Sequence, residues 1–296
     1  MNVSDNNSFN ISVIVVAFNP NINQLLELCG NLVQEGAHVI VVDNSEPSCI
    51  TLEMLPNHCN VINMGANKGI AMAQNFGVDA ALSTGAKAIV FLDQDSTLSF
   101  GFLSNLVSFL KIEKPGIVSP LCIDDITGAE LPFIRLNRLG LPAPIYAGNG
   151  LEPIEADIVI SSGMAVTSSV FKIVGGFDEG MFIDLVDTDW CIRCRSAGVP
   201  IRVIPSVKMR HRIGLKSEQL GPFTVSIHSP ARCYYQIRNC FHLFRKSYVS
   251  IPFALSELIK VIINRTLLLL VIKGRLPYIR AYARGVKHGF LGIYGR

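Results

Sequence analysis

The chain has 296 residues, enough for one large α/β domain or two modest domains. Apolar residues make up 49% of it and charged residues 17%, which favours a protein with a membrane-associated surface. The net charge of +3 is too small to indicate a nucleic-acid-binding protein, so we expect no nucleic acid among its partners.

The first part of the chain alternates between short apolar runs and helical segments. Strand-like runs are ISVIVVAF (11–18), HVIVVDNSE (38–46), NVINMG (60–65) and AIVFLDQD (88–95). Helical patterns occupy residues 21–36 and 67–85, between the first and second runs and between the third and fourth. This alternation predicts βαβ units and a mainly parallel, buried sheet flanked by helices.

Polar clusters follow three of these strands at the point where each strand ends. They are Phe18-Asn19, Asp43-Asn44 and Asp93-Gln94-Asp95. In open α/β sheets, ligands bind at the carboxyl ends of the strands. Two neighbouring carboxylates repel each other, and a hard cation such as Mg²⁺ or Mn²⁺ with phosphate oxygens relieves that repulsion. The alternative is that these acids only form turns or cap loops.

Two common nucleotide-binding signatures are missing from the sequence. It has no GxxxxGK[ST] motif, which argues against a P-loop NTPase, and no GxGxxG after the first strand. A nucleotide could still bind through Asp43, which can accept from a ribose hydroxyl or a base N–H. A turn cap is the other interpretation of Asp43.

The second half of the chain contains a β-rich run at 156–177 and a helical run, WCIRCRSAG, at 190–198. Gly163 in the first run indicates a close approach by a ligand or by another backbone, or a bulge. Asp184, Asp187 and Asp189 precede the helical run and are more acids than helix capping requires. A helix N-terminus lowers the pKa of a carboxylate and keeps it ionised, as a general base must be.

Six motifs together resemble those of family 2 inverting glycosyltransferases of the GT-A fold. They are SVIVVAFNP, VVDNSE, NKGIAMAQNFG, FLDQDS, ISSGMAV and GGFDEGMFIDLVDTDWCIRCRSAG, within residues 11–240. LDQDS and FIDLVDTDW resemble in particular the bacterial rhamnosyltransferase branch. The resemblance implies a GT-A (Rossmann-like) sheet with a C-terminal helical extension, and a single displacement that inverts the sugar.

The resemblance also implies which residues contact the donor nucleotide-sugar. These are Phe18, Asn19 and Asp43 at the base and ribose, Asn67, Lys68 and Gly69 at the nucleotide turn, and Ser162, Gly163 and Met164 under the sugar. ARCYYQIRN (231–239) resembles a family pattern in a helix near the active site, and its Arg232 and Arg238 suit phosphate contacts. Simple packing of its tyrosines is the alternative.

The metal and the catalytic base are implied in the same way. Asp93 and Asp95 match the DxD motif that holds ribose and Mg²⁺ or Mn²⁺, and His211 matches a further metal ligand, or is a structural histidine. Asp187 matches the acid that activates the acceptor hydroxyl. Val186 stands where many relatives have Glu, so Asp184 is kept as the reserve base.

We expect residues 1–225 to form the catalytic domain, with a nucleotide-binding half (11–110) and an acceptor half (111–225), and residues 226–296 to form a helical segment. From residue 250 onward this segment has eight basic residues against one acid, Glu257. Its apolar run TLLLLVI is too short to span a bilayer, which favours an amphipathic helix on an anionic membrane. Packing on the catalytic domain or in a homodimer is the alternative.

Scattered cysteines and the first ten residues indicate a cytosolic location. The eight cysteines show no paired disulfide spacing, and the lone CxxC of Cys191 and Cys194 lacks a second pair to complete a zinc site. MNVSDNNSFN has no basic start followed by an apolar run, so we expect no signal peptide. We therefore expect a peripheral protein on the cytoplasmic face of the inner membrane.

The expected reaction moves L-rhamnose from dTDP-β-L-rhamnose to a hydroxyl of a lipid-linked glycan acceptor in bacterial surface polysaccharide or O-antigen synthesis. A UDP- or GDP-sugar donor is the first alternative. A nucleotidyltransferase would carry a Gly-rich, basic loop after the first strand, and FNPNINQ is neither. Complete acids at Asp93, Asp95 and Asp187 argue against a non-catalytic sugar-binding protein. The acceptor is expected to contact residues 121–155, where Pro and Gly indicate loops.

Overall fold

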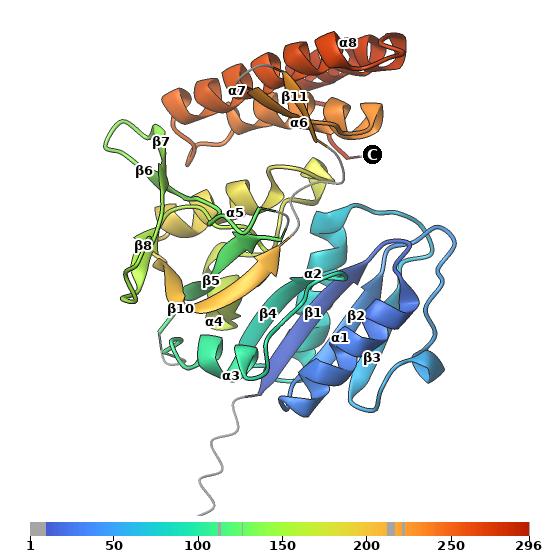
Figure 1. Cartoon of the computed structure of the whole chain (residues 1–296), viewed down its shortest axis with the longest axis vertical. Coiled ribbons are helices and arrows are strands. Elements are labelled where there is room, and N and C mark those ends of the chain that lie inside the picture. The colour runs from blue at the N-terminus through green and yellow to red at the C-terminus, as the bar shows by residue number, and fades with distance from the viewer. Residues whose placement is uncertain (1–9, 112–113, 126, 212–216, 221–222, 296) are drawn as a thin grey trace, which may run out of the picture.

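The computed structural model describes residues 10–111, 114–125, 127–211, 217–220 and 223–295 (Figure 1). Within them, eight strands form one mixed sheet in the order β3-β2-β1-β4-β9-β5-β10-β8. They are β1 (Ile11–Ala17), β2 (His38–Asp43), β3 (Cys59–Asn63), β4 (Ala88–Asp93), β5 (Ile117–Asp124), β8 (Ile154–Ala156), β9 (Ala165–Thr167) and β10 (Ile201–His211). The first four run parallel, as do β5 and β10, whereas β8 and β9 are antiparallel to their neighbours. The expected mainly parallel sheet is confirmed.

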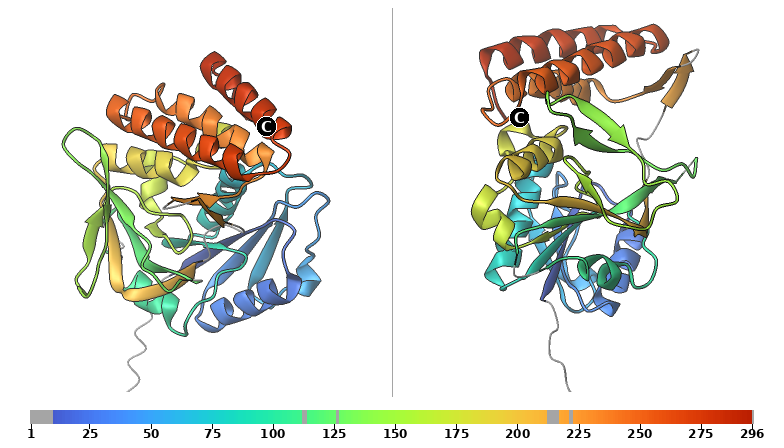
Figure 2. Two further views of the ribbon diagram at one scale, coloured as in Figure 1. Left: turned by 45° about the horizontal axis from the view of Figure 1, so that its top comes forward. Right: turned by 90° about the vertical axis from the view of Figure 1, so that its left-hand side faces the viewer.

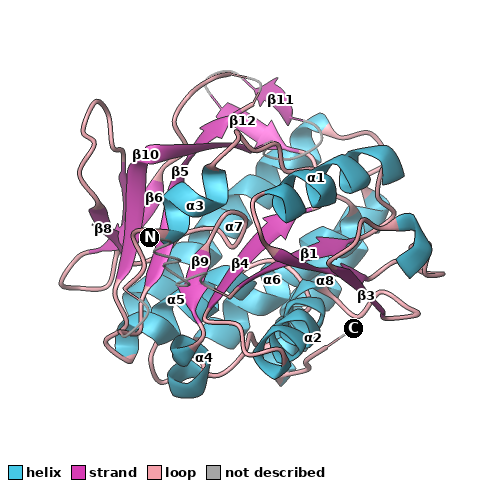
Figure 3. Cartoon of the chain, turned by 90° about the horizontal axis from the view of Figure 1, so that it is seen from below, coloured by secondary structure: helices cyan, strands magenta, loops and turns pink. Residues whose placement is uncertain are grey.

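Helices cover both faces of this sheet, because its apolar strands must be buried on both sides. They are α1 (Ile22–Gln34), α2 (Ile70–Ser83), α3 (Phe102–Val107), α4 (Ser169–Val174) and α5 (Val186–Ser196). In β1, Val13 and Val15 join the core under α1 and α3, whereas Ile14 joins the core under α2, α4 and α5 (Figure 3). Successive strand residues point to opposite faces, so one strand contributes to two cores.

Short elements connect these layers. They are the 3₁₀ turns η1 (Leu52–Met54) and η2 (Glu179–Met181) and the hairpin of β6 (Phe133–Leu136) with β7 (Pro142–Ile145). The helix expected at 190–198 begins earlier, at Val186, so Asp187 and Asp189 lie in its first turn. The helix dipole favours acids in the first turn, which explains why the helix includes this acidic run.

The C-terminal elements form a separate layer over the edge of the sheet where β1 and β4 end (Figures 1 and 2). They are the ribbon of β11 (Ser217–Leu220) with β12 (Phe223–Ser226), and the helices α6 (Pro230–Leu243), α7 (Ile251–Val271) and α8 (Leu276–Leu291). Ser229 and Ser250 cap α6 and α7, each followed by a proline in the first turn. Among the described residues, no helix is both long and apolar enough to cross a bilayer. The division at residue 225 stays a prediction.

Candidate active site

Gln94, the residue between the two acids, joins the ends of β1 and β4. Its Oε1 accepts from the backbone N–H of Phe18 at 2.6 Å, and its Nε2 donates to the Phe18 carbonyl at 3.3 Å. Ser45 adds a second link by accepting from the Asn19 N–H at 2.9 Å. The strand ends therefore form a fixed platform, with Asp93 and Asp95 on either side of Gln94.

Asp43 has a different environment from the one expected at the nucleobase. It is completely buried, and its carboxylate accepts hydrogen bonds from the backbone N–H groups of Ser45, Cys49 and Ile50 at 3.0, 2.6 and 3.0 Å. Two of these bonds go to Oδ2 and one to Oδ1. Asp43 therefore organises the loop after β2, as its loop-capping interpretation predicts, and its contact with the nucleotide stays a prediction.

The turn at residues 67–69 is tied to the same platform. The Asn44 side chain accepts from the Lys68 N–H at 2.8 Å and donates to Asn67 Oδ1 at 3.2 Å. Gly69 has φ +89°, and a Cβ there would lie 2.5 Å from the Phe182 carbonyl oxygen. Glycine is thus required by another segment of the chain, and a nucleotide contact at this turn stays a prediction.

A cavity of about 530 Å³ opens beside the platform and brings together most of the predicted chemical groups. Its lining includes Asp93, Asp95, Ser162, Asp184, Asp187, His211 and Arg232. These residues come from β4, the loop before β9, α5 with its preceding loop, β10 and α6. Motifs that are far apart in the sequence therefore meet in one place. Asp93 and Arg232, for example, are 139 positions apart.

Asp93, Asp95 and His211 are the candidate metal ligands. His211 Nδ1 lies 3.9 Å from Asp93 Oδ2. Burial raises the pKa of the Asp93 carboxyl, His211 opposes the rise, and the Asp95 charge adds to it. Across the described ranges, no three His, Cys, Asp or Glu side chains are already arranged around one metal position. Two carboxylates and one imidazole at one cavity are nevertheless suitable donors for Mg²⁺ or Mn²⁺.

Of the three residues expected under the donor sugar, only Ser162 lines the cavity. Gly163 has φ +83°, and a Cβ there would lie 2.7 Å from Pro120 Cγ. Packing against Pro120 and the backbone angle therefore require a glycine at this position. Met164 is completely buried in the core, which corrects its expected contact with the donor. The turn at Gly163 separates Ser162, which lines the cavity, from Met164, which packs in the core.

Asp187 lines both this cavity and a more apolar pocket of about 390 Å³. Its Oδ2 accepts from the Ser161 N–H at 3.2 Å. The sequence predicts a lowered pKa here, but burial raises the pKa of Asp187 despite the N–H groups of Ser161, Asp187 itself and Thr188. A carboxylate with a raised pKa is a stronger base, which suits proton abstraction better than the expected shift.

Asp184, the reserve base, is held in an ion pair. Arg232 donates from Nε to both Asp184 oxygens, at 3.0 and 3.2 Å, and from Nη2 at 2.9 Å. This bidentate pairing occupies both oxygens of Asp184, so Asp187 has the carboxylate that is freer to meet an acceptor hydroxyl. Arg232 lies at the cavity, as expected for a phosphate contact, and its use there stays a prediction.

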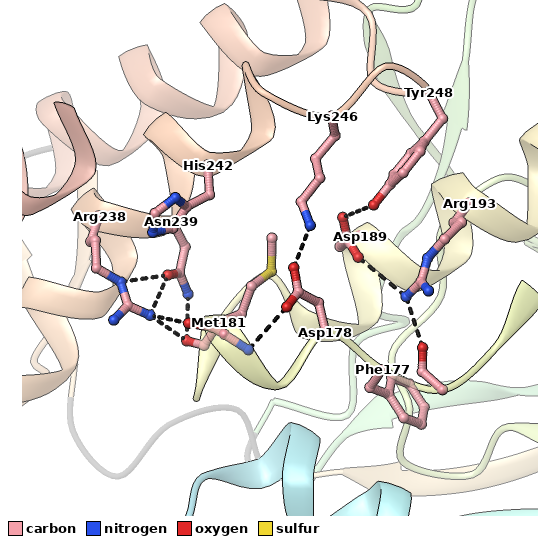
Figure 4. A network of polar contacts seen from close by, with 12 residues as sticks. Phe177, Asp178, Met181, Asp189, Arg193, Arg238, Asn239, His242, Lys246 and Tyr248 are labelled. Atoms are coloured by element: carbon pink, nitrogen blue, oxygen red, sulfur yellow. Dashed lines mark hydrogen bonds and ion pairs between the residues drawn. The ribbon is translucent and has the colours of Figure 1, made fainter. Parts of the chain in front are cut away.

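Arg238 does not reach the cavity and is corrected to a structural role. It is completely buried and donates to the carbonyls of Gly180 and Met181 at 2.7 and 3.0 Å (Figure 4). Its neighbour Asn239, which the sequence motifs do not single out, donates from Nδ2 to the carbonyls of Met181, Ile183 and Asp184 at 2.9, 2.8 and 2.9 Å. The two side chains together hold the loop that precedes Asp187.

That loop has unusual backbone angles. Phe182, Asp184 and Leu185 have φ values of 65°, 65° and 61°, which non-glycine residues rarely adopt. Such strain persists only where surrounding contacts maintain it, and Arg238 and Asn239 supply those contacts. The sequence signal for this role was the pair Arg238-Asn239, which lies in a helix already expected near the site.

A second set of contacts ties α5 to the segment between α6 and α7 (Figure 4). Buried Asp189 accepts from the Tyr248 hydroxyl at 2.8 Å and from Arg193 at 3.4 Å. Lys246 forms an ion pair with Asp178 at the start of η2. Asp178, Asp189 and their partners therefore fix the orientation of the helix that carries Asp187.

The CxxC pair has no sign of redox chemistry. Cys191 and Cys194 are completely buried free thiols. Burial raises the pKa of Cys191 to about 12 and raises that of Cys194 as well, so neither forms a thiolate at neutral pH.

Comparisons with known proteins identify the family of the chain. Residues 12–172 match the model of the family described as Glycosyl transferase family 2. The chain is 35% identical over 287 residues to dTDP-rhamnosyl transferase RfbF of Shigella flexneri, covering 97% of each chain. It is 22% identical to the low-salt glycan biosynthesis hexosyltransferase Agl10 of Haloferax volcanii, covering 88% of this chain and 85% of that one.

Solved structures support the fold. S. aureus TarS residues 1–349 in complex with UDP-GlcNAc has a TM-score of 0.57 at 15% identity, covering 96% of this chain and 81% of that one. GalNAc-T7 with UDP, GalNAc and Mn²⁺ has a TM-score of 0.57 at 14% identity, covering 87% and 54%. These glycosyltransferases share the GT-A architecture that the sequence predicts. With the family model matching more than half of its length, the chain belongs to glycosyl transferase family 2.

Proposed function

We propose that this glycosyltransferase moves L-rhamnose from dTDP-β-L-rhamnose to a hydroxyl of a glycan acceptor, with inversion at C1. The observation that carries the donor assignment is the 35% identity, over 97% of both chains, to a dTDP-rhamnosyl transferase. The chemistry is supported by one cavity that holds two strand-end carboxylates and a separate, basic carboxylate, Asp187.

Asp93 and Asp95 would hold Mg²⁺ or Mn²⁺, with His211 as a further ligand. The bound ion would supply Lewis-acid stabilisation of the leaving nucleoside diphosphate. Asp187 takes the proton of the acceptor hydroxyl as its oxygen bonds to C1 and the bond from C1 to the diphosphate oxygen breaks. One displacement leaves no covalent intermediate, so the chain needs no nucleophile of its own.

The acceptor would enter from the apolar pocket on the far side of Asp187. That pocket is lined by Leu131, Phe133 and Ile134, which lie in the stretch expected to contact the acceptor, and by Ile158. Apolar side chains suit the C–H face of a sugar ring, while Asp187 supplies the polar contact. The donor diphosphate then occupies the strand-end side of the larger cavity and the reacting sugar of the acceptor occupies the smaller one, with the base between them.

The C-terminal layer would lie on the cytoplasmic face of the inner membrane, where a lipid-linked O-antigen acceptor is found. Large apolar residues of α7 and α8 are about half exposed or more, among them Ile259, Ile263 and Phe290. Basic residues such as Arg280 are exposed on the same helices and complement anionic lipid headgroups. Flotation with phosphatidylglycerol vesicles, absent with phosphatidylcholine vesicles, is expected. Dimers in gel filtration without flotation would assign this face to a second copy instead.

A donor panel tests the rhamnosyl assignment. The purified protein is offered dTDP-rhamnose, UDP-glucose, UDP-galactose and GDP-mannose with Mg²⁺ or Mn²⁺, and products are read by mass spectrometry. Transfer from dTDP-rhamnose, abolished by EDTA, is the expected result. Turnover with a UDP- or GDP-sugar alone would overturn the donor while leaving the family and fold in place.

A further inference from the structure

A second polar pocket of about 270 Å³ lies between α6 and α7 and adjoins the active-site cavity. The two share Asp184, Leu185, His228 and Gln236 in their linings. The second pocket is completed by three residues of α7: Val261, Asn264 and Arg265. A polar path therefore leads from the catalytic carboxylates to the C-terminal helices.

Arg265 is the unusual member of this pocket. It is only 6% exposed, and its Nη1 donates to the Cys233 thiol at 3.1 Å, while Nε is buried without a hydrogen-bond partner. In the part of the chain that the structure describes, no carboxylate lies within 4.0 Å of its guanidinium. The nearby Asp184 is already paired with Arg232.

A buried cation without a counter-charge is unfavourable, so buried charges are normally paired. His228 adds no further positive charge: burial, Arg232 and Arg265 lower its pKa to about 4, so it is neutral at physiological pH. Asp184, the carboxylate in the lining of this pocket, is paired with Arg232, so it is not a partner for Arg265. An anion is the ligand chemistry that would complete such a pocket.

We propose that the Arg265 pocket binds a phosphate or diphosphate group, and that this group is the one joining the acceptor glycan to its lipid carrier. The assignment rests on the proposed glycosyl transfer. The donor diphosphate is already assigned to Asp93 and Asp95, at the other side of the cavity. Ile262, which is 52% exposed, lies three residues before Arg265 and on the same side of α7, so a lipid chain leaving the pocket would meet an apolar side chain.

The test compares one glycan on two carriers, a lipid diphosphate and an uncharged alkyl glycoside. Wild type is expected to use the diphosphate acceptor at least 10-fold better in kcat/KM. Arg265→Gln should remove that preference while leaving the uncharged acceptor and the donor KM unchanged, and Arg265→Lys should restore part of it. Arg202→Gln removes an exposed charge of β10, away from the C-terminal helices, and serves as the matched control, with no change expected.

Binding of inorganic pyrophosphate in EDTA tests the pocket without requiring transfer. Pyrophosphate should raise the Tm of wild type and of Arg202→Gln but not of Arg265→Gln, whose own Tm should be no lower because no carboxylate loses its partner. This result holds even if the rhamnosyl assignment fails. Equal Tm shifts in all three proteins would overturn the anion site. A raised donor KM in Arg265→Gln, with both acceptors equally affected, would assign the pocket to the donor and overturn the acceptor assignment.

Discussion

The two sides of the active-site cavity are built in different ways. The strand-end side carries Asp93 and Asp95 and is positioned by the parallel register of β1 and β4, extended by Gln94. The loop side carries Asp187 and is positioned by side chains of α6, which follow it by more than fifty residues. Geometry on the strand-end side thus derives from backbone register, whereas geometry on the loop side derives from side-chain hydrogen bonds donated by α6.

This difference predicts how each side responds to mutation. A strand end is held by many backbone hydrogen bonds, so one lost side-chain contact is largely compensated. The loop before Asp187 has three residues at positive φ and depends on Arg238 and Asn239. Losing one of those contacts leaves buried carbonyls unsatisfied, which is more costly than losing an exposed hydrogen bond.

The largest effect is expected from Asp187→Asn, which removes the base while keeping the shape. Positioned general bases typically contribute about 10²–10⁴-fold, so kcat should fall by roughly that factor. Nucleotide binding, measured by calorimetry, should persist because the strand-end side is untouched. Turnover at the wild-type rate would exclude Asp187 as the base.

The same variant tests the raised pKa of Asp187. Because the folded-state pKa lies above the unfolded value, the ionised carboxylate destabilises the fold once the pH exceeds both values. Asp187→Asn should therefore raise Tm at pH 7–8. The gain should disappear below about pH 4, where Asp187 of the wild type is protonated in both the folded and the unfolded state. A Tm lowered at neutral pH would show that the charge stabilises the fold. The acid limb of wild-type kcat/KM should likewise lie above the ordinary Asp range.

An intermediate effect is expected from Asn239→Ala, which acts on the loop side without touching the cavity. It leaves the carbonyls of Met181, Ile183 and Asp184 without their amide partner. An unsatisfied buried group costs about 1–3 kcal/mol, so Tm should fall by several degrees and kcat should fall with it. Asn105→Ala, at an exposed position of α3, is the control. Unchanged kcat at permissive temperature would separate the loop geometry from catalysis.

The comparison also explains what the sequence could and could not predict. The platform was predictable because apolar runs ending in polar residues locate strand ends, and parallel strands end at one edge. The environment of Asp43 was not predictable, because a strand-end acid can face either a ligand or its own loop, and its bonds from the N–H groups of Cys49 and Ile50 depend on how that loop folds. The roles of Arg238 and Asn239 depend on carbonyls of a loop whose φ values no residue pattern reveals.

The smallest effect is expected from Gln94→Leu on the strand-end side. The substitution keeps most of the side-chain volume but removes both hydrogen bonds to the Phe18 backbone. These bonds are exposed, so water can replace them, and a net loss of about 0.5–1 kcal/mol is expected. Donor KM should rise by roughly 2–5-fold with little change in kcat, measured by initial rates at saturating acceptor. A fall in kcat as large as that of Asn239→Ala would show that the strand ends are no better buffered than the loop, and the contrast between the two sides would be lost.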